Sequence, residues 1–255
     1  MIIMLMTMTG LGSWLEKFLL DIIVKLSQDN PMSKIVFFTG AGISKESGLE
    51  TFRDKDGMWS NRSLQDLITV EGWKRDPEKV LEFYNKRRRD VKKAEPNYAH
   101  KRIAEFQKNR DTLIVTQNID DLHERAGSEN IIHLHGKINE AKNEDDEIIE
   151  WLGDIRLGDK LNSLQIRPNV VLFGDAVPEY RNAYAQMESA DVVVVIGTSL
   201  QVAPASYLID DATENGLQVI YLDPEAGHWN DETLCIRETA CEGIDEVLNI
   251  IKNYE

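Results

Sequence analysis

Residues 35–44 read IVFFTGAGIS, an apolar run followed at once by two glycines. The run IVFFT is typical of a strand buried on both faces of a parallel sheet. Glycines at positions 40 and 42 let the backbone approach a pyrophosphate, and a helical pattern follows that would supply free N–H donors. The third glycine of the dinucleotide-binding fingerprint is not at its usual spacing, so a plain glycine-rich turn stays an alternative.

Similar short apolar runs recur along the chain and alternate with helical segments. This alternation predicts an α/β fold, a Rossmann-like doubly wound parallel sheet with a smaller inserted helical domain. The further strand candidates are 112–116 (TLIVT), 131–134 (IIHL), 170–173 (VVLF), 192–197 (VVVVIG) and 219–222 (VIYL).

Two polar stretches, 54–99 and 137–167, break the alternation, and we assign them to the small domain. The Rossmann-like domain then comprises 34–53, 100–136 and 168–255. Residues 1–33 form an N-terminal extension, in which Trp14, Phe18, Ile22 and Leu26 have helical spacing. Either this extension is a helix that docks on the protein or a partner, or Met32 is the natural start.

The composition indicates which classes of partner and which cellular compartment suit the protein. A formal net charge of −15 over 255 residues disfavours nucleic acid and anionic membranes and favours basic protein segments, although it also fits mere solubility. The two cysteines, Cys235 and Cys241, suit a reducing compartment. No apolar stretch of membrane-spanning length and no signal-peptide pattern is present, so we expect a cytoplasmic protein. The oligomeric state is not indicated.

Polar motifs follow several of the predicted strands. TQNIDDLH at 116–123 offers amide and carboxylate groups that suit a carboxamide and ribose hydroxyls, unless Asn118 or Asp120 only caps a helix. His133 and His135 alternate along a strand and would share a face, so either one is a candidate general base or a structural histidine. The turn 197–200, GTSL, suits a phosphate or a ribose, or is a plain strand-to-helix turn.

Taken together, the motifs resemble the ordered series of the sirtuin family, from about residue 34 to the C-terminus. The matching segments are GAGIS (40–44), GL (48–49), TFR (51–53), TQNID (116–120), HG (135–136), RP (167–168), FGD (173–175) and GTSL (197–200). The resemblance implies an NAD⁺-dependent protein-lysine deacylase, either a deacetylase, a desuccinylase/demalonylase or both, that binds acylated-lysine proteins and releases nicotinamide and O-acyl-ADP-ribose.

The resemblance also implies residue roles. His135 would be the catalytic base, and Val171 and Phe173 would bind the substrate peptide. Asp223 stands where the family usually has asparagine near the adenine ribose. The NAD-binding residues would be Gly40, Ala41, Gly42, Phe52, Arg53, Gln117, Asn118, Asp120, Gly197, Thr198, Ser199 and Asp223.

One departure concerns zinc, which most sirtuins bind with two cysteine pairs after the His-Gly motif. Between Gly136 and Ile166 this chain has neither cysteine nor histidine, so we expect no metal site. The small domain would then be held by packing alone, through Trp151, Leu152, Ile155 and Leu157.

A second feature concerns the acyl group. Tyr84 and Arg87 resemble the Tyr-x-x-Arg pair of the sirtuin class that removes succinyl and malonyl groups. Three residues apart, they would share a helix face, where a guanidinium binds a carboxylate bidentately. The alternative is that Arg87 belongs to the solvated basic run 86–89, with Tyr84 packed in the small domain.

Two other classes of function stay open. One is an NAD⁺ glycohydrolase or ADP-ribosyltransferase on the same scaffold, and the other is a non-catalytic NAD-binding module. The complete set of Gln117, Asn118, Asp120 and His135 argues against the non-catalytic module.

Overall fold

The computed structural model describes residues 34–51, 67–227 and 233–252, all of which belong to one compact unit, Ser33–Glu255. None of the described helices is both long enough and apolar enough to cross a membrane. The N-terminal extension lies outside the described residues.

A six-stranded parallel sheet with the order β11-β10-β9-β1-β2-β3 forms the centre of this unit. Each neighbouring pair is parallel, and Ile35 of β1 aligns with Thr112 on one side and Val192 on the other. The predicted Rossmann-like α/β fold is therefore confirmed. The strands are β1 (Ile35–Thr39), β2 (Thr112–Thr116), β3 (Ile131–His133), β9 (Val192–Ile196), β10 (Gln218–Leu222) and β11 (Leu234–Ile236).

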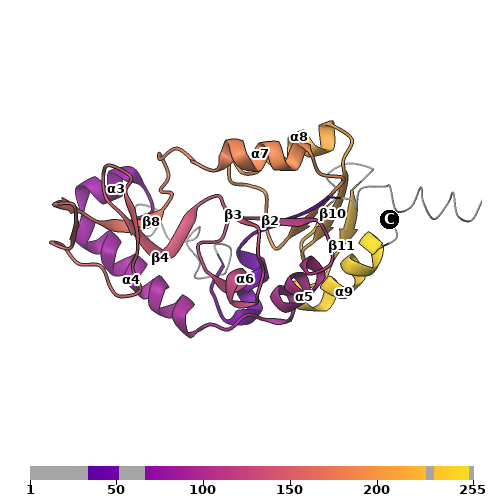
Figure 1. Cartoon of the computed structure of the whole chain (residues 1–255), viewed down its shortest axis with the longest axis horizontal. Coiled ribbons are helices and arrows are strands. Elements are labelled where there is room, and N and C mark those ends of the chain that lie inside the picture. Colours follow the sequence, from indigo (N-terminus) through magenta and orange to yellow (C-terminus); the bar gives the residue numbers. More distant parts are fainter. Residues whose placement is uncertain (1–33, 52–66, 228–232, 253–255) are drawn as a thin grey trace, which may run out of the picture. The chain divides into compact units, whose positions relative to one another are not determined.

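Helices cover both faces of this sheet (Figure 1). Side chains of α5 (Tyr98–Gln107) and α9 (Ala240–Ile251) pack on one face with Ile35 and Phe37. Those of α7 (Tyr180–Glu188) and α8 (Tyr207–Glu214) pack on the other with Val36 and Phe38. Because successive side chains of β1 enter opposite cores, positions 35–38 must be apolar, which explains the run IVFF. The last residue, Thr39, is buried with its hydroxyl hydrogen-bonded to Thr116.

The polar stretches build a second, smaller group of elements. The antiparallel strands β5 (Ile148–Glu150), β4 (Gly136–Lys142) and β8 (Arg167–Val170) form a sheet beside α3 (Val70–Arg75) and α4 (Pro77–Lys93), and β6 (Lys160–Leu161) pairs with β7 (Leu164–Gln165). The inserted region expected to be helical thus also contains strands. The division of the chain into two domains stays a prediction.

The candidate strand 170–173 is not part of the parallel sheet, so that prediction was wrong. Only Val170 belongs to a strand, β8, which pairs with β4. The Phe173 N–H donates to the Ile68 carbonyl, and Val170 and Leu172 are buried against side chains of α4. A run of four apolar residues cannot show which core it enters.

The packing predicted for the small domain is right in part. Ile155 is buried and Trp151 packs against its cluster, but the side chains of Leu152 and Leu157 are 60% and 51% exposed. The reason lies in the anchoring of Ile155, whose N–H and carbonyl are both hydrogen-bonded to the Asn85 side chain at 2.8 Å. Ile155 is therefore held inward in this loop, and Trp151 packs beside it.

Arg88 is the second anchor that α4 provides. Its guanidinium is buried, donates through Nε to the Ile138 carbonyl at 2.7 Å, and donates through Nη1 to the Gly153 carbonyl at 2.8 Å. Burial lowers the pKa of Arg88 to about 10, which still leaves the side chain charged at neutral pH. Arg88 and Asn85 thus fasten the 138–155 segment to α4 by hydrogen bonds to its backbone.

Replacing Arg88 by methionine should therefore lower the free energy of unfolding by about 3 kcal/mol, since the buried Ile138 carbonyl and the partly buried Gly153 carbonyl lose their donor. The matched control is Arg89→Met, because Arg89 makes an exposed ion pair with Asp154 at 2.7 Å that is worth less than about 1 kcal/mol. Urea denaturation measures both values. Equal destabilisation by the two substitutions would contradict the anchoring role of Arg88.

Candidate active site

A cavity of about 410 Å³ opens at the carboxyl ends of the parallel strands and extends to α4 and the loop after β8. Open α/β sheets bind their ligands at this edge, and the volume suits a small molecule. Of the predicted site residues, the structure brings these to the cavity wall: Gly40, Ala41, Gly42, Tyr84, Arg87, Gln117, Asn118, Asp120, His135, Val171, Phe173, Gly197, Thr198, Ser199 and Asp223. Phe52 and Arg53 lie outside the described residues.

The glycine-rich turn after β1 packs directly on a second glycine turn after β9. The Gly42 N–H donates to the Gly197 carbonyl at 2.8 Å. A Cβ atom on Gly42 would lie 2.6 Å from the Gly197 Cα, and Gly197 itself has a φ of 62°. Glycine is required at both positions by this close approach, which leaves bare backbone at the cavity floor, a surface that suits a pyrophosphate.

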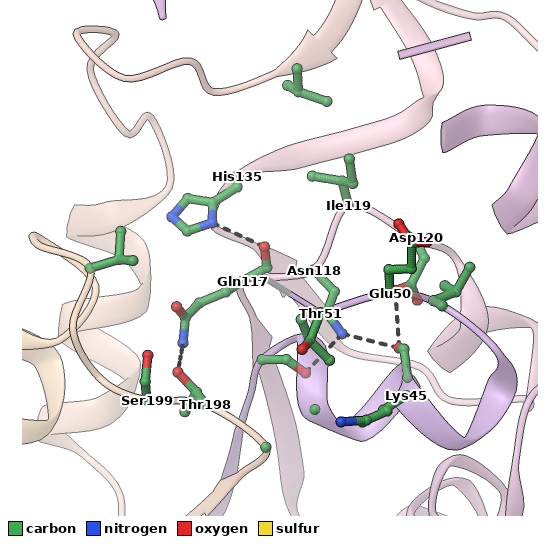
Figure 2. Close-up of a pocket in the computed structure, with 18 of the residues that line it drawn as sticks. Lys45, Glu50, Thr51, Gln117, Asn118, Ile119, Asp120, His135, Thr198 and Ser199 are labelled. Carbon is green, nitrogen blue, oxygen red and sulfur yellow. Dashed lines mark hydrogen bonds between the residues drawn. The ribbon is translucent and has the colours of Figure 1, made fainter. Parts of the chain in front are cut away.

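Polar side chains after β2 form hydrogen bonds with residues of this floor, as Figure 2 shows. Gln117 Nε2 donates to Thr198 Oγ1 at 2.9 Å, and Asn118 Nδ2 lies 3.1 Å from the Gly40 carbonyl and 3.2 Å from Ser44 Oγ. The turn after β1 and the turn after β9 thus hold the two amides in place.

Asp120 has two hydrogen-bond partners, and the helix-cap alternative was wrong, because the N-cap of the following helix is Asp121. Its Oδ2 accepts from Ser44 Oγ at 3.0 Å, and its Oδ1 accepts from the Leu122 N–H at the start of α6 (Leu122–Arg125) at 3.2 Å. Burial raises the pKa of Asp120, and these two hydrogen bonds oppose that rise. The carboxyl group therefore orders the loop and also lines the cavity.

His135 follows β3 and presents one ring nitrogen to the protein. Nδ1 lies 3.0 Å from the Gln117 carbonyl, which can only accept, so Nδ1 carries the hydrogen. In the neutral ring, Nε2 is then free to accept a proton. Burial lowers the pKa of His135, and the hydrogen bond with Gln117 opposes this. A neutral, oriented imidazole at a cavity wall is suited to general-base catalysis.

The chain turns sharply after His135, as Gly136 predicted. Gly136 has a φ of 77°, and an added Cβ would overlap the Asn169 carbonyl. His133, in contrast, is buried and is not among the residues that line the cavity. The expectation that both histidines face one site was wrong, because β3 ends at His133 and the turn at 134–135 breaks the alternation.

The part of the cavity beside α4 combines apolar walls with two polar side chains. Tyr84 is buried, and this burial raises its pKa, which the positive charges of Arg167 and Arg87 oppose. Arg87 Nη2 donates to the Glu50 carbonyl at 3.3 Å. The apolar residues around them include Ile68, Phe83, Val91, Ile119, Val170 and Leu172.

The opposite part of the cavity lies at the ends of β9 and β10. Asp223 follows β10 directly, is buried, and accepts a hydrogen bond from the Glu225 N–H at 2.8 Å through Oδ1. Two polar contacts at the site were not identified from the sequence. One is Ser44, whose hydroxyl is hydrogen-bonded to both Asn118 and Asp120. The other is the buried pair of Thr39 and Thr116, whose hydroxyl oxygens lie 2.8 Å apart. Ser44 lies within the motif GAGIS, and this position in the sequence could have indicated that it belongs to the site.

A glycine floor, oriented amides and a neutral histidine in one cavity define the class: an α/β enzyme that binds a dinucleotide. The comparisons agree with this class. Residues 40–204 match the model of the Sir2 family. The chain is 43% identical over 222 residues to a protein of Helicobacter pylori named NAD-dependent protein deacylase, covering 85% of this chain and 96% of that relative. A protein of the same name from Bacteroides thetaiotaomicron is 39% identical over 231 residues, with 86% and 98% covered.

Solved structures show the same similarity. A Sir2 homologue in complex with NAD superposes with a TM-score of 0.78 at 34% identity, covering 88% of this chain and 91% of that one. A Sir2 variant bound to a deacetylated p53 peptide and 3′-O-acetyl ADP-ribose gives 0.75 at 28% identity, with 91% and 98% covered. The chain belongs to the Sir2 family, the sirtuins.

Proposed function

We propose that this sirtuin is an NAD⁺-dependent protein-lysine deacylase that accepts acidic acyl groups such as succinyl and malonyl. The observation that carries the activity is one cavity that holds both the glycine floor and His135, whose Nδ1 is fixed by the Gln117 carbonyl. Named relatives with the same activity cover most of the chain. The acyl preference rests on Tyr84 and Arg87 at the apolar end of that cavity.

The residues present fit NAD⁺. When bound, NAD⁺ supplies an electrophilic ribose carbon and nicotinamide as the leaving group. The backbone of Gly40 to Gly42 would hold the pyrophosphate, Gln117, Asn118 and Asp120 the nicotinamide ribose, and Thr198, Ser199 and Asp223 the adenosine half. His135 would take a proton from a ribose hydroxyl through Nε2.

Substrate would enter beside the segment after β8. The Val171 N–H donates a hydrogen bond to the His135 carbonyl, with an N–O distance of 2.9 Å. Phe173, at the cavity wall, is 42% exposed. An extended peptide pairing with this segment would place its acyl-lysine between His135 and Tyr84. Lysine-rich protein segments suit the acidic composition, and we propose the cytoplasm as the location.

The test of the activity is nicotinamide release from NAD⁺ with and without an acyl-lysine peptide. Release that requires the peptide and yields stoichiometric free lysine supports the deacylase. Equal release without peptide would instead show an NAD⁺ glycohydrolase, and absence of release with retained NAD⁺ binding would show a non-catalytic module.

We also propose that the small domain folds without zinc. The 137–166 segment has no cysteine or histidine to serve as a ligand. Its described residues are held by other means: Leu81, Ala141, Ile155 and Ile166 form a buried cluster, and Asn85 and Arg88 bind its backbone. The donor set does not fit the metal.

We therefore expect purified, tag-free protein to contain well under about 0.1 zinc per chain and to keep its activity after dialysis against a chelator. Elemental analysis and the peptide assay measure the two quantities. A zinc-containing sirtuin treated in parallel is the positive control. About one zinc per chain, or loss of activity that added zinc restores, would contradict the proposal.

A further inference from the structure

His133 is a buried histidine next to the cavity for which the proposed reaction has no use. Its side chain is 4% exposed. Nδ1 lies 3.0 Å from the backbone carbonyl of Asn118, and Nε2 lies 2.8 Å from Oε1 of Glu124 in α6. The ring therefore connects a carboxylate on one side to the backbone of a cavity residue on the other.

The partners determine the protonation of this ring. A carbonyl oxygen only accepts, so Nδ1 must carry a hydrogen, and an ionised carboxylate also only accepts, so Nε2 must carry one too. Burial raises the pKa of Glu124, but the hydrogen bond and charge of His133, together with a backbone hydrogen bond and the charge of Lys137, lower it overall. Both ring nitrogens of His133 thus face acceptors, an arrangement that only the doubly protonated ring satisfies, and Lys137 Nζ lies 3.6 Å from the same partly exposed carboxylate.

Asn118 is held at three of its four polar groups by the protein. Its N–H donates to Thr116 Oγ1 at 3.1 Å, its Nδ2 binds the Gly40 carbonyl and Ser44 Oγ, and its carbonyl accepts from His133. Within the described part of the chain, no protein group donates to Asn118 Oδ1, and Asn118 lines the cavity. Oδ1 is thus the atom left for a ligand.

We propose that His133 and Glu124 form a positioning pair that fixes the Asn118 backbone and so aims Asn118 Oδ1 at the nicotinamide ribose. This deepens the proposed function and rests on it. The charge-assisted bond at the carbonyl is stronger than a neutral one, and the Glu124 carboxylate offsets the positive charge of the ring beside a ribose that becomes cationic. His135 acts on the reacting atoms, whereas His133 acts through Asn118.

Two substitutions of His133 test the hydrogen bonds of Nδ1 and Nε2 separately. In His133→Asn the amide nitrogen takes the place of Nδ1 and keeps the bond to the Asn118 carbonyl. In His133→Gln the amide takes the place of Nε2 and keeps only the bond to Glu124. We expect His133→Gln to lower kcat about tenfold with KM for NAD⁺ within about twofold, and His133→Asn to keep kcat within about threefold of wild type.

Equal loss of kcat in the two variants, or a larger loss in His133→Asn, would overturn the proposal. It would also be overturned if the loss of kcat in each variant were proportional to the fall in its melting temperature.

Imidazole ¹⁵N shifts at pH 7.5 provide a readout independent of turnover. We expect both nitrogens of His133 to be protonated in the wild type and only one in Glu124→Gln. A neutral His133 ring in the wild type would overturn the ion pair. Absence of peptide-dependent nicotinamide release by the wild type would refute the proposed function, and the ¹⁵N measurement would still test the pair.

Discussion

Replacing His135 by alanine is expected to lower kcat for deacylation at least about 100-fold while NAD⁺ binding persists, because general-base catalysis contributes at least that factor. His135 is oriented by the Gln117 carbonyl, and its Nε2 has no other assigned use. The glycine floor and the amides that would bind NAD⁺ do not depend on this ring. Turnover of an acyl-lysine peptide and calorimetric titration with NAD⁺ measure the two effects separately.

The control for this experiment is His133→Ala, which should do less harm, since His133 does not line the cavity. If His135→Ala kept more than about a tenth of wild-type turnover, the assignment of the base would be wrong. The reverse ranking of the two variants would show that the other histidine is the base.

The acid limb of the rate profile gives a further check on His135. A base must be unprotonated to act, and burial lowers the pKa of His135 below its ordinary value of 6.5. The base therefore stays active to lower pH than an exposed histidine would, and kcat/KM should fall only at pH values below about 6.5. A limb centred above that value would point to a different group.

The sequence predicted the parallel sheet well and the inserted region poorly, for a physical reason. Strands such as β1 and β9 are buried on both faces, so all their positions except Thr39 are apolar and the run is visible without any context. Strand β4 reads GKINEAK, and only Ile138 and Ala141 are buried in it. With two buried positions and a register shift against β8, its pattern has no clear period.

The location of the site was predictable because the polar motifs follow strands whose carboxyl ends meet at one edge. The contacts within the site were not. The bond from Ser44 to Asp120 joins residues 76 positions apart and depends on the register of β1 and β2. The separation of His133 from His135 depends on where β3 ends, and strand ends are poorly marked in a sequence.

The acyl preference gives the second large effect. Arg87→Met should lower kcat/KM on a succinyl-lysine peptide about 100-fold and change the value on the acetyl-lysine version of the same peptide by less than about threefold. The guanidinium lies at an apolar end of the cavity next to buried Tyr84, where a carboxylate without a cationic partner would be costly to bury. A neutral acetyl group has no such requirement.

The arrangement around Arg87 also shows how it would be available to a substrate. Its described hydrogen bond, from Nη2 to the Glu50 carbonyl, is 3.3 Å long and uses one of five N–H donors, so a carboxylate can be bound without breaking it. The matched control is Lys86→Met, which removes one charge from the same basic run at an exposed position that does not line the cavity. Tyr84→Phe should reproduce part of the loss on the succinyl peptide. If Arg87→Met affected both peptides equally, or if Lys86→Met matched it on the succinyl peptide, Arg87 would be part of a solvated basic run that does not recognise the acyl carboxylate.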